Sequence, residues 1–323
     1  MKIATIGTSK ITEQFISALR FGTDIILEGV YSRDGQRAEA FREKHGANRA
    51  FSDLSVLAKA PEIDAVYIAS PNAFHEDQSR LFLLNGKHVF CEKPMTVSLR
   101  AQKELDAIAR ERGLIYLEAI MTLHSPGFRV LREQLGKLGR IRNANFSYFQ
   151  LSSKYPAYIR GENPNIFNPE MKAGALMDLG VYPIYLSAAL FGRPNTIISS
   201  AQFLDSGADA SGSAVLGYDG LTVTVSYSKV AQGYSPSEIY GDTGTLRIAS
   251  TSQLNGIDLF TKDRIVHLVS QSMTRDEVMA AEALCFEKSV KEGESESYRF
   301  FKQTAEIVRE ITDVIREQNH FPF

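Results

Sequence analysis

The first 120 residues alternate between buried strands and helices, and this alternation constrains the fold more than any other feature of the chain. Strand patterns occur at residues 2–6, 25–31, 50–51, 63–69, 88–92 and 114–120, and helical patterns lie between them. Parallel strands joined by helices form a doubly wound sheet. We therefore predict an α/β fold, with a doubly wound parallel sheet over residues 1–121.

Past residue 122 the pattern becomes that of an α+β domain. Strands are predicted at 141–151, 213–218, 221–228 and 245–249, and helices at 125–135, 275–291 and 297–317. Residues 221–228 alternate between apolar and hydroxyl side chains, which is typical of a strand with one buried face. We predict a second domain over 122–323 with an open, mostly antiparallel sheet. Its last helix can pack back on the first domain.

Composition excludes several classes of protein. The 323 residues suit two domains, and 44% of them are hydrophobic. A net charge of −2 without a basic run argues against nucleic acid and anionic membranes as partners. The only two cysteines, Cys91 and Cys285, lie in apolar or helical patterns, so we expect free thiols and a cytoplasmic protein. We identify no apolar run of membrane-spanning length, no signal segment and no metal site.

The first strand leads through a glycine turn into a helix, as in a dinucleotide-binding unit. Only the first glycine of G-x-G-x-x-G is present, and Ser9 and Thr12 replace the other two. Gly7 permits the tight turn, and the helix N-terminus offers N–H groups to a pyrophosphate. Two interpretations stay open, a plain βα turn and a pyrophosphate site. The candidate residues of that site are Gly7, Thr8, Ser9, Lys10 and Ile11.

The second strand ends at Ser32 and Arg33, where an NAD-binding unit usually carries a carboxylate for the ribose. An arginine at this point accommodates the 2′-phosphate of NADP. We therefore predict that Ser32 and Arg33, with Arg37 as a weaker candidate, contact NADP. Arg37 is better explained as part of a solvated helix face, and Asp34 as a helix N-cap.

Residues 88–94 form a short buried strand that ends in Glu92-Lys93-Pro94. Pro94 stops the strand and leaves Lys93 at its carboxyl end, the edge at which ligands bind in an open α/β sheet. A surface lysine at a strand end is the alternative. Ser70-Pro71-Asn72 and His75 follow the preceding strand and are expected at the same edge, although a lone histidine there is usually a cap or a packed residue.

The second domain supplies candidates of its own. If residues 173–183 are helical, Asp178 and Tyr182 share one face, and a carboxylate beside a phenol suits proton transfer. An Asp–Tyr hydrogen bond that joins a helix to its neighbour is the alternative. In the turn-rich loop 152–169, Tyr155 and Arg160 are substrate candidates, with Tyr158 and Phe167 beside them, although Arg160 is better explained as a surface residue.

Two motifs together resemble those of the Gfo/Idh/MocA oxidoreductases. Glu92-Lys93-Pro94 is similar to their E-K-P motif, and residues 174–182 resemble G-G-A-L-x-D-x-G-x-[HY]. Ser32-Arg33, Ser70-Pro71-Asn72 and His75 also fall where that family has them. The resemblance implies a Rossmann domain that binds the cofactor through these residues and Glu92, followed by a domain that often dimerises through its open sheet. Tyrosine at position 182 resembles the branch with dihydrodiol dehydrogenase, xylose dehydrogenase and glucose–fructose oxidoreductase.

The resemblance implies an oxidoreductase that uses NADP(H), with NAD as the alternative cofactor, on a secondary alcohol of a sugar, polyol or cyclic diol. Lys93 would stabilise the reacting oxygen, Tyr182 would be general acid or base, and Asp178 would orient Lys93 or the substrate. Lys93 is the alternative proton carrier. Lys93 and Tyr182 are expected to meet from different domains of a homodimer or larger assembly. A cofactor-binding sensor or regulator without turnover is the rival hypothesis.

Overall fold

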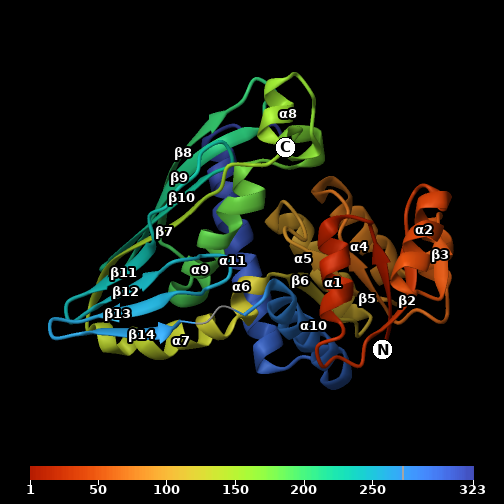
Figure 1. The fold of residues 1–323 in the computed structure, drawn as a ribbon, viewed down its shortest axis with the longest axis horizontal. Helices are drawn as coiled ribbons and strands as arrows, with labels where there is room; N and C mark the ends of the chain where they lie inside the picture. The colour runs from red at the N-terminus through yellow and green to blue at the C-terminus, as the bar shows by residue number, and fades with distance from the viewer. Residues whose placement is uncertain (271–272) are drawn as a thin grey trace. The chain divides into compact units, whose positions relative to one another are not determined.

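The computed structural model describes residues 1–270 and 273–323, and the chain forms two compact units (Figure 1). The first unit contains residues 1–120 and 274–303, and the second contains 121–273 and 304–323. Each unit is built around one sheet. Residues 274–303 were predicted as part of the second domain, but in the structure they pack with the first unit.

The first unit has a six-stranded parallel sheet in the order β3-β2-β1-β4-β5-β6. The predicted doubly wound parallel sheet is therefore confirmed. Its strand order reverses between β1 and β4, which is where such sheets bind ligands beyond their carboxyl ends. The strands are β1 (Lys2–Ile6), β2 (Ile26–Tyr31), β3 (Arg49–Phe51), β4 (Ala65–Ile68), β5 (His88–Glu92) and β6 (Tyr116–Ala119).

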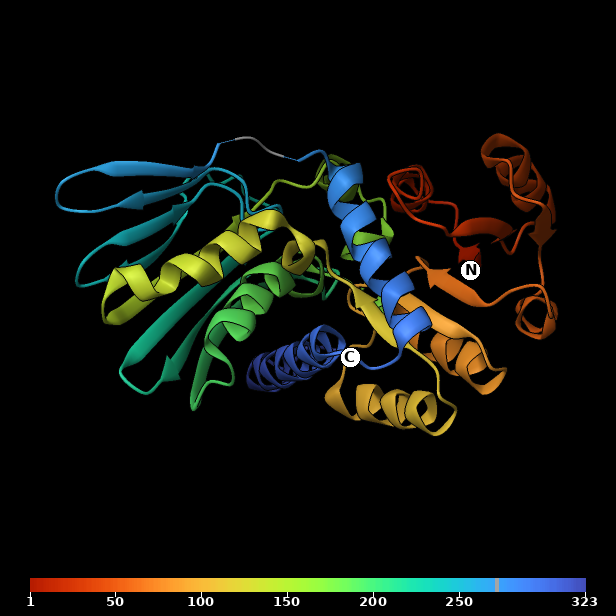
Figure 2. The same cartoon turned by 90° about the horizontal axis from the view of Figure 1, so that it is seen from below.

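Helices cover both faces of this sheet (Figure 2). Helix α1 packs beside α10 on one face, and α4 packs against α5 on the other. Phe90 of β5 stacks on Phe286 of α10 with ring centroids 4.8 Å apart, so the C-terminal part of the chain completes the core of the first unit. The helices are α1 (Lys10–Ala18), α2 (Gly35–His45), α3 (Leu54–Lys59), η1 (Asn72–Phe74), α4 (His75–Leu84), α5 (Leu99–Glu111) and α10 (Arg275–Glu292).

The second unit has an eight-stranded sheet in the order β14-β13-β12-β11-β7-β10-β9-β8. Neighbouring strands run antiparallel except β7 and β10, which are parallel, so the predicted mostly antiparallel sheet is confirmed. In β10, Val223, Val225 and Tyr227 are buried while the hydroxyl residues between them are partly exposed. The strands are β7 (Ile141–Phe149), β8 (Thr196–Phe203), β9 (Asp209–Tyr218), β10 (Leu221–Ser228), β11 (Ser237–Gly241), β12 (Thr245–Ile248), β13 (Ile257–Phe260) and β14 (Ile265–Val269).

Helices α7 and α9 lie along one face of this sheet (Figure 2). The later residues of α11 form a hydrogen bond with α9. Arg309 of α11 donates to the Tyr185 hydroxyl at 3.3 Å. The other face of the sheet carries the hydroxyl residues of β10. The helical segments are α6 (Met121–His124), α7 (Pro126–Gln134), η2 (Leu135–Leu138), α8 (Tyr155–Ile159), η3 (Asn165–Phe167), η4 (Pro169–Met171), η5 (Leu176–Gly180), α9 (Val181–Phe191) and α11 (Glu296–Gln318).

The helix that the sequence left open over residues 173–183 is present and consists of two helical forms. Residues Leu176–Gly180 wind as a π-helix, and an α-helix begins at Val181. Pro183 lies in the first turn of α9, close to the junction with the π-helix. Residues 169–191 are also long and apolar enough to span a membrane by length and composition alone, which corrects our expectation of no such run. Because 78% of the most apolar window is buried inside the unit, this segment is core.

Candidate active site

The turn between β1 and α1 brings the backbone unusually close to β4. Gly7 has φ +107°, and a Cβ added there would lie 2.7 Å from the carbonyl oxygen of Ala69. Only glycine accepts this conformation without strain. Ser9 is the N-cap of α1, and its hydroxyl lies 3.4 Å from the Thr12 hydroxyl rather than on the N–H groups of the first turn. Those N–H groups have no side-chain cap, and the anion site at Gly7, Thr8, Ser9, Lys10 and Ile11 stays a prediction.

Arg33 follows Ser32 after the end of β2, and its guanidinium lies 5.7 Å from the centre of the Phe74 ring. Phe74 ends the short helix after β4, so this cation–π contact places Arg33 at the carboxyl edge of the sheet. Ser32 accepts the Asp34 N–H at 3.3 Å. Asp34 caps α2 through the N–H groups of Gln36 and Arg37, as predicted. Arg37 itself is exposed on α2.

His75 joins the loops that follow β4 and β5. It is buried, with Nε2 2.7 Å from the Ser70 carbonyl and Nδ1 2.9 Å from the Pro94 carbonyl. Burial lowers the pKa of His75 below its ordinary value, although the two carbonyl oxygens oppose this. Both ring nitrogens contact the chain, so the side chain fixes Ser70-Pro71-Asn72 relative to Lys93 and Pro94. The Lys93–Pro94 peptide bond is cis.

Lys93 extends from a buried network of carboxyl groups at the end of β5. The Tyr67 hydroxyl donates to Glu92 at 2.5 Å, and the Lys93 N–H donates to the other Glu92 oxygen at 3.3 Å. Glu282 of α10 is buried, and burial together with the charge of Glu92 raises its pKa well above the ordinary value. Burial also raises the pKa of Glu92, while Tyr67, Lys93 and Arg275 oppose that rise.

In the second unit, Asp178 and Tyr182 occupy the π-helix and the start of α9. The Asp178 side chain is 30% exposed and forms an ion pair with Lys229, whose side chain is only 4% exposed. Tyr182 is buried, and its ring contacts that of Tyr148 edge-on at 5.5 Å. A partly exposed carboxylate fixed by a buried cation suits a group that orients a ligand. Lys93 belongs to the first unit and these groups to the second.

Asp209 lies behind this pair, at the start of β9. It is fully buried, and one carboxyl oxygen accepts the Leu176 N–H at 2.6 Å. Burial raises the pKa of Asp209 to about 7. Gly174 has φ +148°, and a Cβ there would lie 1.8 Å from the other Asp209 oxygen. Asp209 therefore holds the backbone from which the π-helix begins.

The predicted substrate candidates of the long loop fall into different environments. Tyr155 stacks on Tyr158 at 6.2 Å, and Phe167 contacts both rings at 5.9 and 5.4 Å. These three form an aromatic cluster on α8 and η3. Arg160 has a side chain 65% exposed and pairs with Glu162 two residues later. Such exposed pairs contribute little to stability.

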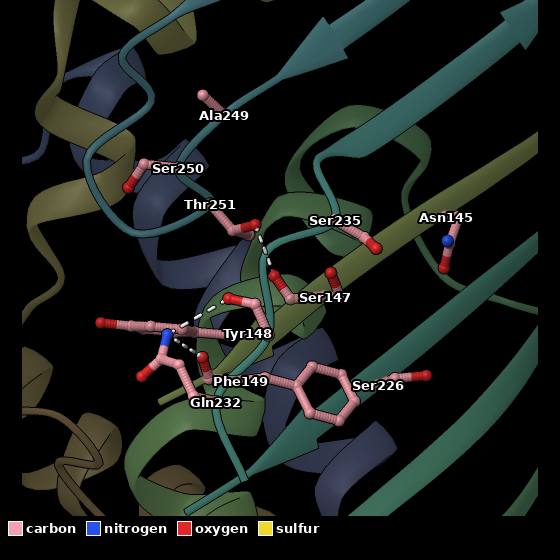
Figure 3. A pocket seen from close by; sticks show the side chains of 11 residues that line it. Asn145, Ser147, Tyr148, Phe149, Ser226, Gln232, Ser235, Ala249, Ser250 and Thr251 are labelled. Atoms are coloured by element: carbon pink, nitrogen blue, oxygen red, sulfur yellow. Dashed lines mark hydrogen bonds between the residues drawn. The ribbon is translucent and has the colours of Figure 1, made fainter. Parts of the chain in front are cut away.

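A cavity of about 470 Å³ opens at the end of β7 (Figure 3). Gln232 donates to the Phe149 carbonyl at 3.3 Å, and Thr251 donates to the Ser147 carbonyl at 2.8 Å. Tyr148 lines this cavity and is the residue whose ring contacts Tyr182. The wall is mostly polar: Asn145, Ser147, Tyr148, Phe149, Ser226, Gln232, Gly233, Ser235, Ala249, Ser250 and Thr251.

Lys229, Asp209 and Tyr148 were not predicted as site residues from the sequence. Lys229 directly follows β10, just as Lys93 directly follows β5, so a lysine at a strand end was an available signal. Asp209 and Tyr148 gave none, because an aspartate near a turn and a tyrosine in a strand are ordinary in sequence.

Comparison with known protein families decides the family of the chain. Residues 1–119 match the model of an oxidoreductase family with an NAD-binding Rossmann fold, and residues 131–247 match the GFO/IDH/MocA C-terminal domain. The chain belongs to the Gfo/Idh/MocA family. The resemblance in the two motifs is thus confirmed, and this Gfo/Idh/MocA protein is an oxidoreductase with an NAD(P)-binding domain.

Individual relatives agree with this assignment. The chain is 40% identical over 263 residues to scyllo-inositol 2-dehydrogenase (NADP(+)) IolU of Bacillus subtilis (strain 168), covering 81% of this chain and 80% of that protein. It is 33% identical over 196 residues to trans-1,2-dihydrobenzene-1,2-diol dehydrogenase of Mus musculus, covering 59% and 56%. KijD10, a 3-ketoreductase from Actinomadura kijaniata solved with NADP and TDP-benzene, shares the fold with a TM-score of 0.88 at 24% identity, covering 99% and 98%.

Proposed function

We propose that this oxidoreductase is an NADP(H)-dependent dehydrogenase acting on a secondary alcohol of a polyol, sugar or cyclic diol. The observation that carries the proposal is the single sheet edge that gathers the Gly7 turn, Arg33 and Lys93. The names of two relatives support the substrate class, because scyllo-inositol and trans-1,2-dihydrobenzene-1,2-diol are both cyclic secondary alcohols.

The residues at this edge fit a dinucleotide. The N–H groups at the start of α1 suit the pyrophosphate, and the close approach at Gly7 leaves no side chain in its way. Ser32 and Arg33 suit the 2′-phosphate of NADP. Ser70, Pro71 and Asn72, held by His75, and Glu92 complete the proposed set. A bound nicotinamide supplies the acceptor or donor of a hydride.

The protein's own side chains stabilise the substrate oxygen and transfer its proton. In the oxidation direction the substrate hydroxyl loses one proton as its carbon loses a hydride. We assign Lys93 to stabilise the developing oxyanion by its charge, and Tyr182 to accept the proton, with Asp178 orienting the substrate or Lys93. A tyrosine is suitable for this role because a nearby cation lowers the pKa of its phenol. Lys93 is the alternative proton acceptor.

The test is a panel of alcohols assayed with NADP⁺ and NAD⁺ by the absorbance of the reduced cofactor. It includes inositols, aldoses and trans-dihydrobenzenediol. We expect turnover of at least one cyclic alcohol and a preference for NADP⁺ of tenfold or more, because a charge-assisted contact to phosphate contributes about 1.5–3 kcal/mol. Absence of turnover on every member, with tight cofactor binding, would favour a sensor.

Arg33→Ala isolates the cofactor part of the proposal. It should weaken NADP(H) binding and leave NAD(H) binding almost unchanged, measured by fluorescence titration. Arg110→Ala, on the exposed part of α5, is the matched control and should change neither. Equal affinities of the unaltered protein for the two cofactors would contradict the assignment.

We also propose a cytoplasmic homodimer or larger homo-oligomer, joined through the uncovered face of the eight-stranded sheet. Thr222, Thr224 and Ser226 of β10 lie on this face, and Ile198 and Val215, opposite each other on β8 and β9, are 70% and 42% exposed there. A mixed polar and apolar face suits an interface. Cys91 and Cys285 are not joined in a disulfide, which suits the cytoplasm.

A further inference from the structure

We propose that Lys229 is a positioning residue for this reaction, acting through Asp178. Lys229 directly follows β10, and its Nζ contacts Oδ2 of Asp178 in the π-helix. The ammonium is buried, whereas the carboxylate it holds is 30% exposed. The pair therefore holds a carboxylate whose side chain stays partly exposed. This inference rests on the proposed role of Asp178 in the reaction.

The backbone of Lys229 is fixed by hydrogen bonds to two neighbouring segments. The Lys229 N–H donates to the Ala210 carbonyl at 2.9 Å, and its own carbonyl accepts the Ser152 N–H at 2.8 Å. These bonds connect the end of β10 to the start of β9 and to the loop after β7. The backbone from which the Lys229 side chain starts is therefore fixed by two neighbouring segments.

A second carboxyl group faces the same ammonium. Asp209, one residue before Ala210, is buried and interacts electrostatically with Lys229. The Tyr227 hydroxyl is buried on the β10 side and interacts electrostatically with Asp209. Lys229 thus interacts with one partly exposed acid and one buried acid. Without the charge of Lys229, the ionised form of Asp178 would lose its cationic partner, and protonation of Asp178 would become easier.

The consequence for the reaction is a carboxylate that stays ionised and keeps one orientation. The contact of Lys229 with Oδ2 restrains the orientation of the Asp178 carboxylate. A protonated or rotated Asp178 would orient its ligand less well. The inference therefore predicts a pH effect, which a merely structural lysine would not produce.

The experiment compares Lys229→Met, which keeps the stem and removes the charge, with the unaltered protein. We expect the acidic limb of the kcat/KM profile to move to higher pH by about one unit or more, since an opposite charge at this range shifts a carboxyl by about 1–3 units. In an Asp178→Asn background, adding Lys229→Met should lower kcat less than about twofold, because the group through which Lys229 acts is already neutral.

Lys262→Met, in the exposed turn between β13 and β14, is the matched control and should leave the profile in place. If Lys229→Met fails to fold, Lys229→Gln is measured in the same way. An unmoved acidic limb, or full additivity with Asp178→Asn, would overturn the inference.

A second readout needs no substrate. Carbon NMR of the carboxyl groups, with Asp178 assigned by its loss in Asp178→Asn, follows the titration of Asp178 in the intact protein. Lys229→Met should raise its midpoint, and an unchanged midpoint would refute the inference. If the unaltered protein turns over no alcohol while the midpoint still rises, the proposed function fails and the control of Asp178 by Lys229 stands.

Discussion

Asp209 shows how a single buried acid can serve the site at a cost in stability. Its carboxyl group anchors the Leu176 N–H at the start of the π-helix, and burial raises its pKa to about 7. In the unfolded chain the same group titrates at its ordinary, lower pKa. Over the interval between these two values the folded protein binds a proton that the unfolded chain has released.

This difference in pKa determines whether the free energy of unfolding rises or falls with pH. Between about pH 4 and about pH 7, Asp209 makes the free energy of unfolding fall as pH rises, by at most about 1.4 kcal/mol per pH unit. Asp209→Asn keeps an oxygen for Leu176 and removes the titration. Urea unfolding across this interval should therefore show the variant gaining stability relative to the unaltered protein as pH rises.

The exposed Asp205→Asn is the control and should track the unaltered protein throughout. A constant difference between Asp209→Asn and the unaltered protein over the whole interval would contradict the raised pKa. This measurement of unfolding requires no substrate.

The sequence alone was enough to predict the site residues that belong to a recognisable local motif. Lys93 was predicted at a strand end because Pro94 stops the strand, and the structure places it there. Lys229 was missed because its partner is chosen by tertiary contacts, as β10 pairs with β9 and the π-helix lies over both. His75 was predicted as a cofactor residue, but its two carbonyl contacts come from loops whose proximity no local pattern reveals.

At the scale of elements, the turn between β1 and α1 is the most constrained part of the first unit. Gly7 combines a left-handed φ with close approach to the backbone of Ala69, which lies just after β4. A backbone neighbour cannot rotate away as a flexible side chain can. The position therefore sets the distance between the two central strand ends, where the cofactor is proposed to bind.

Gly7→Ala should lower the free energy of unfolding by about 1–3 kcal/mol and weaken NADP(H) binding, because both the backbone conformation and the contact with Ala69 become strained. Gly22→Ala is the matched control. It has a similar φ of +83°, but a Cβ there meets nothing within 4 Å. Chemical denaturation and cofactor titration measure both effects. Equal losses in the two variants would show that crowding at Ala69 is unimportant.

Elements with strong periodicity were predictable, and those set by tertiary contacts were not. The helices that became α5 and α7 and the one-sided strand β10 follow from their apolar spacing. The π-helix at Leu176–Gly180 was expected as part of a plain helix, since nothing local marks the extra residue in its turn. Strand β8 was missed, because its sequence TIISSAQF does not alternate regularly between apolar and polar residues.

At the scale of the whole molecule, the proposed assembly depends on one uncovered sheet face. Helices cover the opposite face, and Ile198 and Val215 form an exposed apolar pair next to the hydroxyl rows of β10. Exposed apolar surface of this kind marks interaction sites more often than isolated exposed residues do.

The protein should therefore be a dimer or larger by light scattering at micromolar concentration. Replacing Ile198 and Val215 together by lysine places two charges on the proposed interface of each protomer and should shift the protein to monomer. Ile26→Lys, at a 53% exposed site in the first unit, should leave the assembly unchanged. A monomeric unaltered protein would refute the proposal.

The central claim is that Lys93 and Tyr182 act on the same oxygen, and kinetics of a double variant test it most directly. On any alcohol that the panel identifies, Lys93→Met and Tyr182→Phe should each lower kcat by about 10²-fold or more, with cofactor affinity nearly intact. The double variant should be little slower than the slower single variant, because groups that act as a unit are not additive. Full activity of Lys93→Met, or losses that multiply in the double variant, would contradict the claim.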